Sequence, residues 1–148
     1  MTQFRYGNVW EEQQHKNSLI LVTTNSFIKR NGCLTMGAGS AKQCRDKFPN
    51  IDLILGTQIK HLSIYGLIVS SDWTSFNVGF FQTKTDWKLN SDLKLIKYSF
   101  ECLNKWMDNH NGVPVHLVYP GINNGCLKEE DVFPIIPQLE NLNIWKLK

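Results

Sequence analysis

Lys84 is the residue whose type and position best suit covalent chemistry, because it directly follows a short β-rich run, Val78–Thr83 (VGFFQT). A lysine at a strand end can bind phosphate as a point charge. A partly buried amine can also lose its proton and become a nucleophile or base. On spacing alone, a solvated surface lysine is the competing interpretation. Trp87, three residues later, is either a pocket wall or part of the core.

Asn25 occupies a similar place, directly after the apolar run Ser18–Thr24 (SLILVTT). A side-chain amide can donate to one hydroxyl and accept from another, which suits a ribose diol. The alternative is a structural role, in which the same amide closes an Asn turn or caps a helix.

Two glycine-rich loops offer anion sites. Met36–Ala41 (MGAGSA) directly precedes a predicted helix, whose first N–H groups and dipole favour an anion. Pro120–Gly125 (PGINNG) follows a predicted strand and is rich in residues that tolerate a left-handed backbone, so its N–H groups can form an anion nest. Each alone is equally compatible with a plain turn or loop. Together they predict a pocket for a diphosphate.

The elements that must position these residues alternate between strands and helices. Such alternation predicts an α/β fold with a sheet covered on both faces, in which ligands bind beyond the carboxyl ends of strands. The expected strands are 18–24, 63–70, 78–83, 115–119 and 143–148, and the expected helices are 40–48, 91–109 and a short or broken one at 129–139.

The composition describes an ordinary globular chain. It has 148 residues, 42% hydrophobic and 20% charged, with a net charge of +3, and this weak bias does not indicate nucleic-acid binding. No apolar run approaches the ~20 residues that span a bilayer. The polar first 18 residues do not resemble a secretory signal. The four cysteines and four histidines lack zinc-ligand spacing, so we expect a cytoplasmic protein with reduced thiols, no metal, no cofactor and no membrane contact.

Four segments resemble the macrodomain family of ADP-ribose-binding modules, and the similarity runs over nearly the whole chain. The branch that it most resembles includes the terminal ADP-ribose glycohydrolase and the antitoxin macrodomain that removes ADP-ribose from DNA. Members of that branch often carry an F-x-T-K-x-x-W motif, which Phe81 to Trp87 match. The segments are GNVW (7–10), VTTNSFIKRNGCLTMGAGSAKQCRDKFP (22–49), FQTKTDW (81–87) and YPGINNGCLKEEDV (119–132).

The resemblance implies one three-layer α/β/α macrodomain over residues 1–148, with a central mixed sheet, and a role for each matched position. Asn8 stands where many macrodomains have an adenine-binding Asp, Asn25 lies near the distal ribose, and Lys84 acts at the anomeric carbon. The implied catalytic residues are Lys84 and Asn25. The implied ligand-binding residues are Asn8, Val9, Met36, Gly37, Ala38, Gly39, Ser40, Ala41, Thr83, Pro120, Gly121, Ile122, Asn123, Asn124, Gly125 and Cys126.

Two departures from the family pattern stand in the second loop. Asn123 and Cys126 replace glycines, and the stretch Gly125–Lys128 (GCLK) lacks the catalytic Asp of the terminal glycohydrolase. A lysine-centred mechanism is what remains.

The leading expectation is therefore a monomeric ADP-ribosyl hydrolase acting on ADP-ribosylated DNA or protein. The alternatives are a non-catalytic ADP-ribose reader or sponge, which the missing carboxylate favours, and a phosphatase acting on ADP-ribose 1″-phosphate. DNA enters as a partner only through the resemblance and not through the charge. The basic residues near the first loop offer a surface for a DNA strand, but a solvated helix and loop surface is the favoured interpretation. These residues are Lys29, Arg30, Lys42, Arg45 and Lys47.

Overall fold

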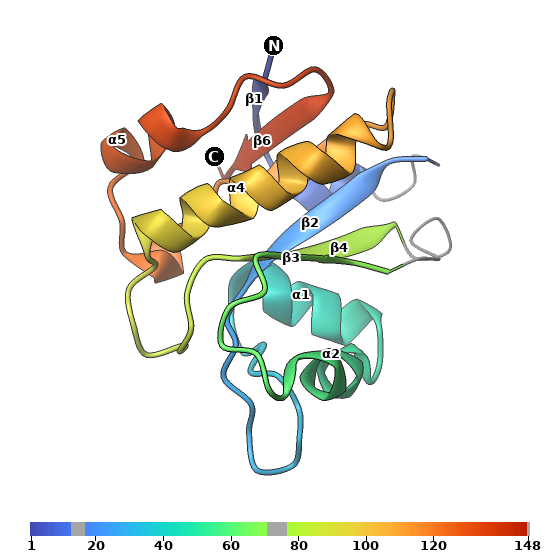
Figure 1. Ribbon diagram of the computed structural model, residues 1–148, viewed down its shortest axis with the longest axis vertical. Coiled ribbons are helices and arrows are strands. Elements are labelled where there is room, and N and C mark those ends of the chain that lie inside the picture. The colour runs from blue at the N-terminus through green and yellow to red at the C-terminus, as the bar shows by residue number, and fades with distance from the viewer. Residues whose placement is uncertain (13–16, 71–76, 148) are drawn as a thin grey trace.

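The computed structural model describes residues 1–12, 17–70 and 77–147, and its centre is a mixed sheet of six strands within those residues (Figure 1). The strands lie in the order β1-β6-β5-β2-β4-β3, and every neighbouring pair is parallel except the antiparallel pair β3 and β4. The mixed sheet predicted from the sequence is confirmed. The strands are β1 Gln3–Tyr6, β2 Leu19–Thr24, β3 Leu67–Val69, β4 Val78–Gln82, β5 Val115–Val118 and β6 Leu142–Lys146.

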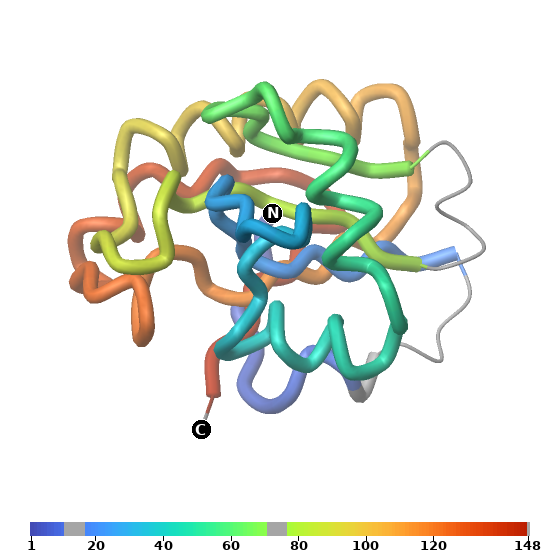
Figure 2. The backbone as a smooth tube through the Cα atoms, turned by 90° about the horizontal axis from the view of Figure 1, so that it is seen from below, coloured from blue at the N-terminus to red at the C-terminus, as the bar shows by residue number. Residues whose placement is uncertain are grey.

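Helices cover both faces of the sheet, as predicted. In Figure 1, α1 and α2 lie on one face and α4 lies on the other, while Figure 2 shows the molecule from the side of α1 and α2. The α-helices are α1 Gly39–Lys47, α2 Ile51–Ile59, α4 Leu93–Asp108 and the single turn α5 Glu129–Val132. Short 3-10 segments span Val9–Glu12, Asn123–Gly125 and Phe133–Ile135.

The central strand β2 shows why the fold has three layers. Its residues alternate between two hydrophobic clusters: Ile20 and Val22 pack with α1 and α2, whereas Leu19 and Leu21 pack with α4. All four are fully buried. Successive side chains of a strand point to opposite faces, so a continuous apolar run requires cover on both sides.

The element boundaries predicted from the sequence agree best with the structure where the apolar pattern is strong. The helix expected at 91–109 is α4, which begins after Asp92, whose side chain accepts a hydrogen bond from the Lys94 amide. The strand expected at 63–70 is much shorter, since only Leu67–Val69 pair with β4. Helix α2 and strand β1 were not predicted.

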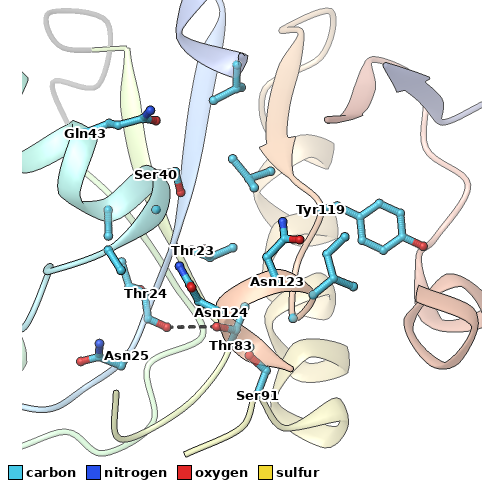
Figure 3. Close-up of a pocket in the computed structure, with 18 of the residues that line it drawn as sticks. Thr23, Thr24, Asn25, Ser40, Gln43, Thr83, Ser91, Tyr119, Asn123 and Asn124 are labelled. Carbon is cyan, nitrogen blue, oxygen red and sulfur yellow. Dashed lines mark hydrogen bonds between the residues drawn. The ribbon is translucent and has the colours of Figure 1, made fainter. Parts of the chain in front are cut away.

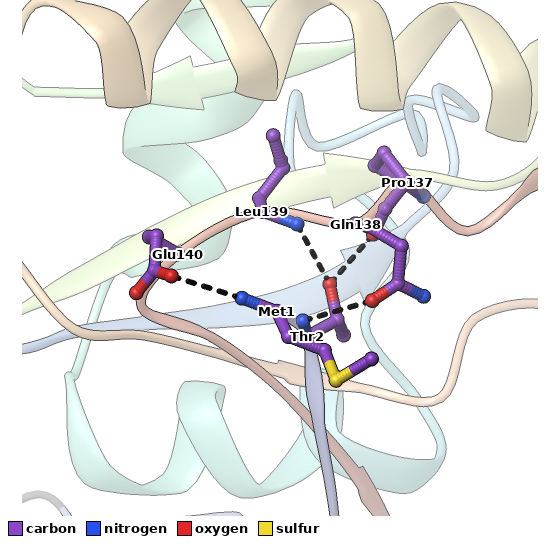
Figure 4. Close-up of polar contacts among 6 residues, drawn as sticks. All are labelled: Met1, Thr2, Pro137, Gln138, Leu139 and Glu140. Carbon is purple, nitrogen blue, oxygen red and sulfur yellow. Dashed lines mark hydrogen bonds and ion pairs between the residues drawn. The ribbon is translucent and has the colours of Figure 1, made fainter.

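Strand β1 is fixed by polar contacts rather than by burial. All four of its residues are exposed, but the preceding Thr2 is held by the segment that leads into β6 (Figure 4). The Thr2 hydroxyl donates to Pro137 O at 2.6 Å and accepts from the Leu139 amide at 3.0 Å, and the Thr2 amide donates to Gln138 Oε1 at 3.2 Å. The Met1 ammonium adds an exposed ion pair with Glu140. These contacts seat β1 beside β6.

The parallel strands all end at one edge of the sheet. From β2 the chain proceeds to β3 and β4 on one side, and α4 then carries it to β5 and β6 on the other. The strand order therefore reverses at β2, and in open α/β sheets a ligand site forms at such a reversal. Within the described residues, no helix is long and apolar enough to cross a bilayer.

Candidate functional site

A cleft of about 820 Å³ opens at this edge, where the carboxyl ends of β2, β4 and β5 meet (Figure 3). This volume is typical of small-molecule sites. Of the 18 site residues that the sequence predicted, 16 line it, including Asn25 and Lys84 at the ends of β2 and β4. The others are Asn8, Val9, Met36, Gly37, Ala38, Gly39, Ser40, Ala41, Thr83, Gly121, Ile122, Asn123, Asn124 and Gly125.

Two predicted residues lie outside the lining. Pro120 is buried beneath the loop that follows β5, and Cys126 is exposed just beyond it. The cleft therefore ends at Gly125, one residue earlier than the sequence suggested.

The first predicted loop brings the open amino end of α1 to the cleft. Ala38 precedes the helix in extended conformation, without a side-chain cap, and the first turn has no acidic residue. The first N–H groups of a helix have no partner inside it and carry its positive dipole end. The Ser40 hydroxyl is buried here without a hydrogen-bond partner. An anionic, hydrogen-bonding ligand group would satisfy these donors.

The second loop turns sharply through left-handed residues. Gly121, Asn123 and Cys126 have φ values of 84°, 59° and 61°. The two positions where the sequence departs from the family glycines thus do need a left-handed backbone. Asn adopts it at small cost, whereas for Cys it costs about 1–2 kcal/mol.

Ser91 lies in the segment that leads into α4 and contacts this loop. Its amide donates to the Gly125 carbonyl at 2.8 Å, and a Cβ on residue 125 would collide with the Ser91 hydroxyl. Only glycine allows this approach, so Ser91 sets how deep the loop lies.

Asn25 closes the turn that follows β2. Its Oδ1 accepts from the Phe27 amide at 2.9 Å, and its Nδ2 donates to Thr35 O at 3.0 Å. The structural role considered for this amide is therefore present. One N–H of the amide remains for a ligand, because Asn25 also lines the cleft.

Lys84 places its ammonium group among three backbone carbonyls. Nζ donates to Leu89 O at 3.2 Å and to both Trp87 O and Asn124 O at 3.4 Å. Three acceptors match the three N–H bonds of an ammonium group, whereas a neutral amine has two and a lone pair. Trp87 lines the cleft beside it and is 49% exposed, so it forms a wall and not part of the core.

The charges of the cleft are positive. Among the described lining residues, Lys84 and Lys146 are the charged ones, and none is a carboxylate. Glu129, outside the lining, holds Lys146 at 2.7 Å and thereby raises the pKa of that amine. In the described part of the chain, no three His, Cys, Asp or Glu side chains gather as metal ligands. The charges of the described lining residues therefore suit an anion.

Several lining residues were not predicted from the sequence. The Thr35 hydroxyl is buried without a partner, and the Tyr119 phenol lies at the end of β5, where burial and nearby Glu129 raise its pKa to about 12. Tyr119 directly precedes the second loop, so its position in the sequence could have marked it as a lining residue. No feature of the sequence marks Ser91 or Gln43 as lining residues. The cleft also includes Gly7, Thr23, Thr24, Val118, Trp145 and Leu147.

No protein-family model matches the sequence, and no significant match exists among curated protein sequences. Solved structures do resemble the fold: this is the macrodomain fold, a mixed sheet between helical layers with its cleft at the strand ends.

The similar structures include macrodomains of DarG. That of Thermus aquaticus DarG has a TM-score of 0.74 at 20% identity, covering 99% of this chain and 97% of the other. That of Mycobacterium tuberculosis DarG has a TM-score of 0.70 at 21% identity, covering 98% and 97%. Thermosipho africanus DarTG, solved in complex with ADP-ribose, has a TM-score of 0.70 at 18% identity, covering 89% of this chain and 38% of the other.

Proposed function

We propose that this chain is a single, monomeric macrodomain that binds ADP-ribose in the cleft and hydrolyses ADP-ribosyl linkages on DNA or protein. One observation carries the proposal: an uncapped helix end, a left-handed loop and Lys84 converge on a cleft lined by no carboxylate among its described residues. A similar fold, that of the Thermosipho protein, was solved with ADP-ribose.

The diphosphate would lie between the amino end of α1 and the loop at Gly121–Gly125. Backbone N–H groups of both segments then donate to its oxygens, and the Ser40 hydroxyl gains the partner that it lacks. The distal ribose would lie near Asn25 and Lys84, which end adjacent strands β2 and β4. Asn8 and Val9 line the cleft beyond β1 and would face the adenine.

Lys84 would do the chemistry at the anomeric carbon. Cleavage of the glycosidic bond passes through an oxocarbenium-like state. A neutral Lys84 amine would either attack that carbon or remove a proton from the ribose. In the first route a C–N bond forms as the glycosidic bond breaks, the leaving group departs with the electron pair and takes a proton from solvent, and water then hydrolyses the C–N bond to release ADP-ribose. In the second route water adds to the carbon that the leaving group has left. An ammonium, by contrast, only offsets negative charge. To become a neutral nucleophile, the side chain must give up one of its three carbonyl acceptors. Positioning by the two loops would supply much of the remaining rate acceleration.

The test is a hydrolysis panel with wild type, Lys84→Ala and Lys84→Arg. The substrates are thymidine- and guanine-linked ADP-ribosylated DNA, protein ADP-ribosylated on Glu or Asp, and ADP-ribose 1″-phosphate. We expect wild type to release ADP-ribose from at least one nucleic-acid or protein substrate, and both variants to lose turnover. Their ADP-ribose affinity should stay within about threefold, because the hydrogen bonds of Lys84 are long and exposed. Unaltered turnover in Lys84→Ala would reject the assignment.

A reader without turnover is the second candidate, favoured by the absence of a carboxylate among the described lining residues. Tight binding of ADP-ribose by calorimetry, with no release from any substrate, would select it. Phosphate release from ADP-ribose 1″-phosphate alone would instead select a phosphatase.

A further inference from the structure

The loop between α2 and β3, residues 60–66, contacts the Asn25 backbone directly and is linked to the Lys84 backbone through the side chain of Gln82. Asn25 and Lys84 follow the ends of neighbouring strands, so the strands set their approximate spacing. The orientation of each residue as it leaves its strand depends on two further side chains, Tyr65 and Gln82.

Tyr65 holds the start of the Asn25 turn. Its hydroxyl donates a short hydrogen bond to the Asn25 carbonyl and lies 2.6 Å from the Thr24 hydroxyl. The ring packs against the hydrophobic cluster beneath α1. Burial raises the pKa of Tyr65, so its oxygen keeps the proton that it donates. This contact fixes the peptide between β2 and the turn that carries the Asn25 amide.

Gln82, the last residue of β4, is fully buried and uses both ends of its carboxamide. Oε1 accepts from the amides of Tyr65 at 2.8 Å and Gly66 at 3.0 Å. Nε2 donates to Ser63 O at 2.8 Å and Lys84 O at 3.2 Å.

The four hydrogen bonds allow only one orientation of the Gln82 amide. If the amide were rotated by 180°, its NH₂ group would face the N–H groups of Tyr65 and Gly66. The carboxamide therefore joins the 60–66 loop directly to the backbone of Lys84. A buried amide is costly without partners, and an apolar side chain would fill the same space without that requirement.

We propose that Tyr65 and Gln82 are positioning residues that fix the Asn25 turn and the Lys84 backbone relative to each other through the 60–66 loop. Tyr65 links the two halves, since its hydroxyl contacts Asn25 and its amide contacts Gln82. The assignment of the sugar end of the ligand to Asn25 and Lys84 rests on the proposed function. The hydrogen-bonded arrangement itself does not.

Tyr65→Phe tests the proposal with the loss of one oxygen atom. In the unliganded protein, hydrogen exchange should quicken in peptides covering residues 25–36 and 84–90. ADP-ribose should bind about five- to tenfold more weakly, because the Asn25 turn is no longer held in place and its amide loses the equivalent of one hydrogen bond to the ribose. AMP should bind as it does to wild type, because it lacks the distal ribose. If turnover occurs, kcat should fall more than KM rises.

Two controls keep the comparison specific. Tyr98→Phe removes a hydroxyl from a half-exposed ring on α4, outside the cleft lining, and should change none of these measurements. Gln82→Met removes the buried carboxamide and should quicken exchange at 84–90 most. Gln58→Met makes the same change on the exposed side of α2. If Gln82→Met does not fold, Tyr65→Phe decides the question alone.

The outcomes separate the two proposals. Unchanged exchange in Tyr65→Phe, or equal weakening of AMP and ADP-ribose, would overturn the positioning role, since equal weakening indicates general destabilisation. A wild type that binds neither nucleotide contradicts the proposed function instead, and the exchange result then decides the positioning role without any ligand.

Discussion

Gly39 and Asn124 face each other across the cleft at van der Waals distance. A Cβ placed on residue 39 would lie 3.3 Å from Asn124 Nδ2, and the φ of Gly39 is 59°, a value that side chains disfavour. The amino end of α1 and the loop after β5 therefore approach each other closely at a glycine.

Gly39→Ala should consequently damage the site in two ways. The left-handed backbone costs about 1–2 kcal/mol of stability, which thermal unfolding measures. The added methyl group presses on Asn124, so ADP-ribose should bind about tenfold more weakly by calorimetry. Gly37→Ala is the matched control, because its Cβ would meet nothing within 4 Å and its backbone is not left-handed. Equal losses in both variants would contradict the close approach.

Ser91 and Gly125 should be energetically coupled. Gly125→Ala alone forces its methyl group into the Ser91 hydroxyl, whereas Gly125→Ala in a Ser91→Gly background has room for it. A double-mutant cycle on the free energy of unfolding should give a coupling of about 1–3 kcal/mol, with the second change rescuing the first. Additive effects would show that the loop moves away and that Ser91 does not set its depth.

Cys126→Gly should stabilise the protein. Cys126 holds a φ of 61° although it has a side chain, and its exposed thiol makes only one weak contact, with Asn124 O at 3.7 Å. Relief of the backbone strain should add about 1 kcal/mol to the free energy of unfolding. Asn123→Gly at a similar φ should change stability less, because Asn tolerates that region. A destabilised Cys126→Gly would mean that the thiol contributes packing.

Stability should fall at alkaline pH because of Cys44. Burial in α1 raises the pKa of its thiol from 9.0 to about 12, so the unfolded chain loses this proton first. The native state then binds more protons than the unfolded state, and the free energy of unfolding decreases as pH rises from 9 towards 12.

Denaturant unfolding at several pH values tests whether the free energy of unfolding falls as the pH rises. Between pH 8 and pH 10, the free energy of unfolding of wild type should decrease by about 1.4 kcal/mol more than that of Cys44→Ala, which lacks the thiol. Cys33→Ala removes a half-exposed thiol from the loop before α1. The free energy of unfolding of this variant should depend on pH as that of wild type does. Parallel losses in wild type and Cys44→Ala would exclude the thiol as the cause.

The sequence predicted those elements whose apolar pattern was strong, and those site residues that closely follow a strand or lie in the glycine-rich loop before a helix. Strand 18–24 was clear because its apolar run is continuous and is buried on both faces, and helix 91–109 was clear because it buries one apolar stripe. Strand β1 was missed because its four exposed residues carry no such stripe, and Thr2 fixes it through contacts to residues 137–139. Tyr65 and Ser91 act through backbone groups that are distant in sequence, so no local motif marks them.

The pairing of β1 with β6 joins Gln3 to Asn143, almost the full length of the chain apart. Contacts of such high sequence separation form late, since closing the intervening loop costs entropy before any pairing is gained. The wall of the cleft at Gly7 and Asn8 can therefore form only after β6 has left the ribosome. A nascent chain halted before residue 142 should already contain β2 and its neighbours β4 and β5, yet still lack part of the cleft wall.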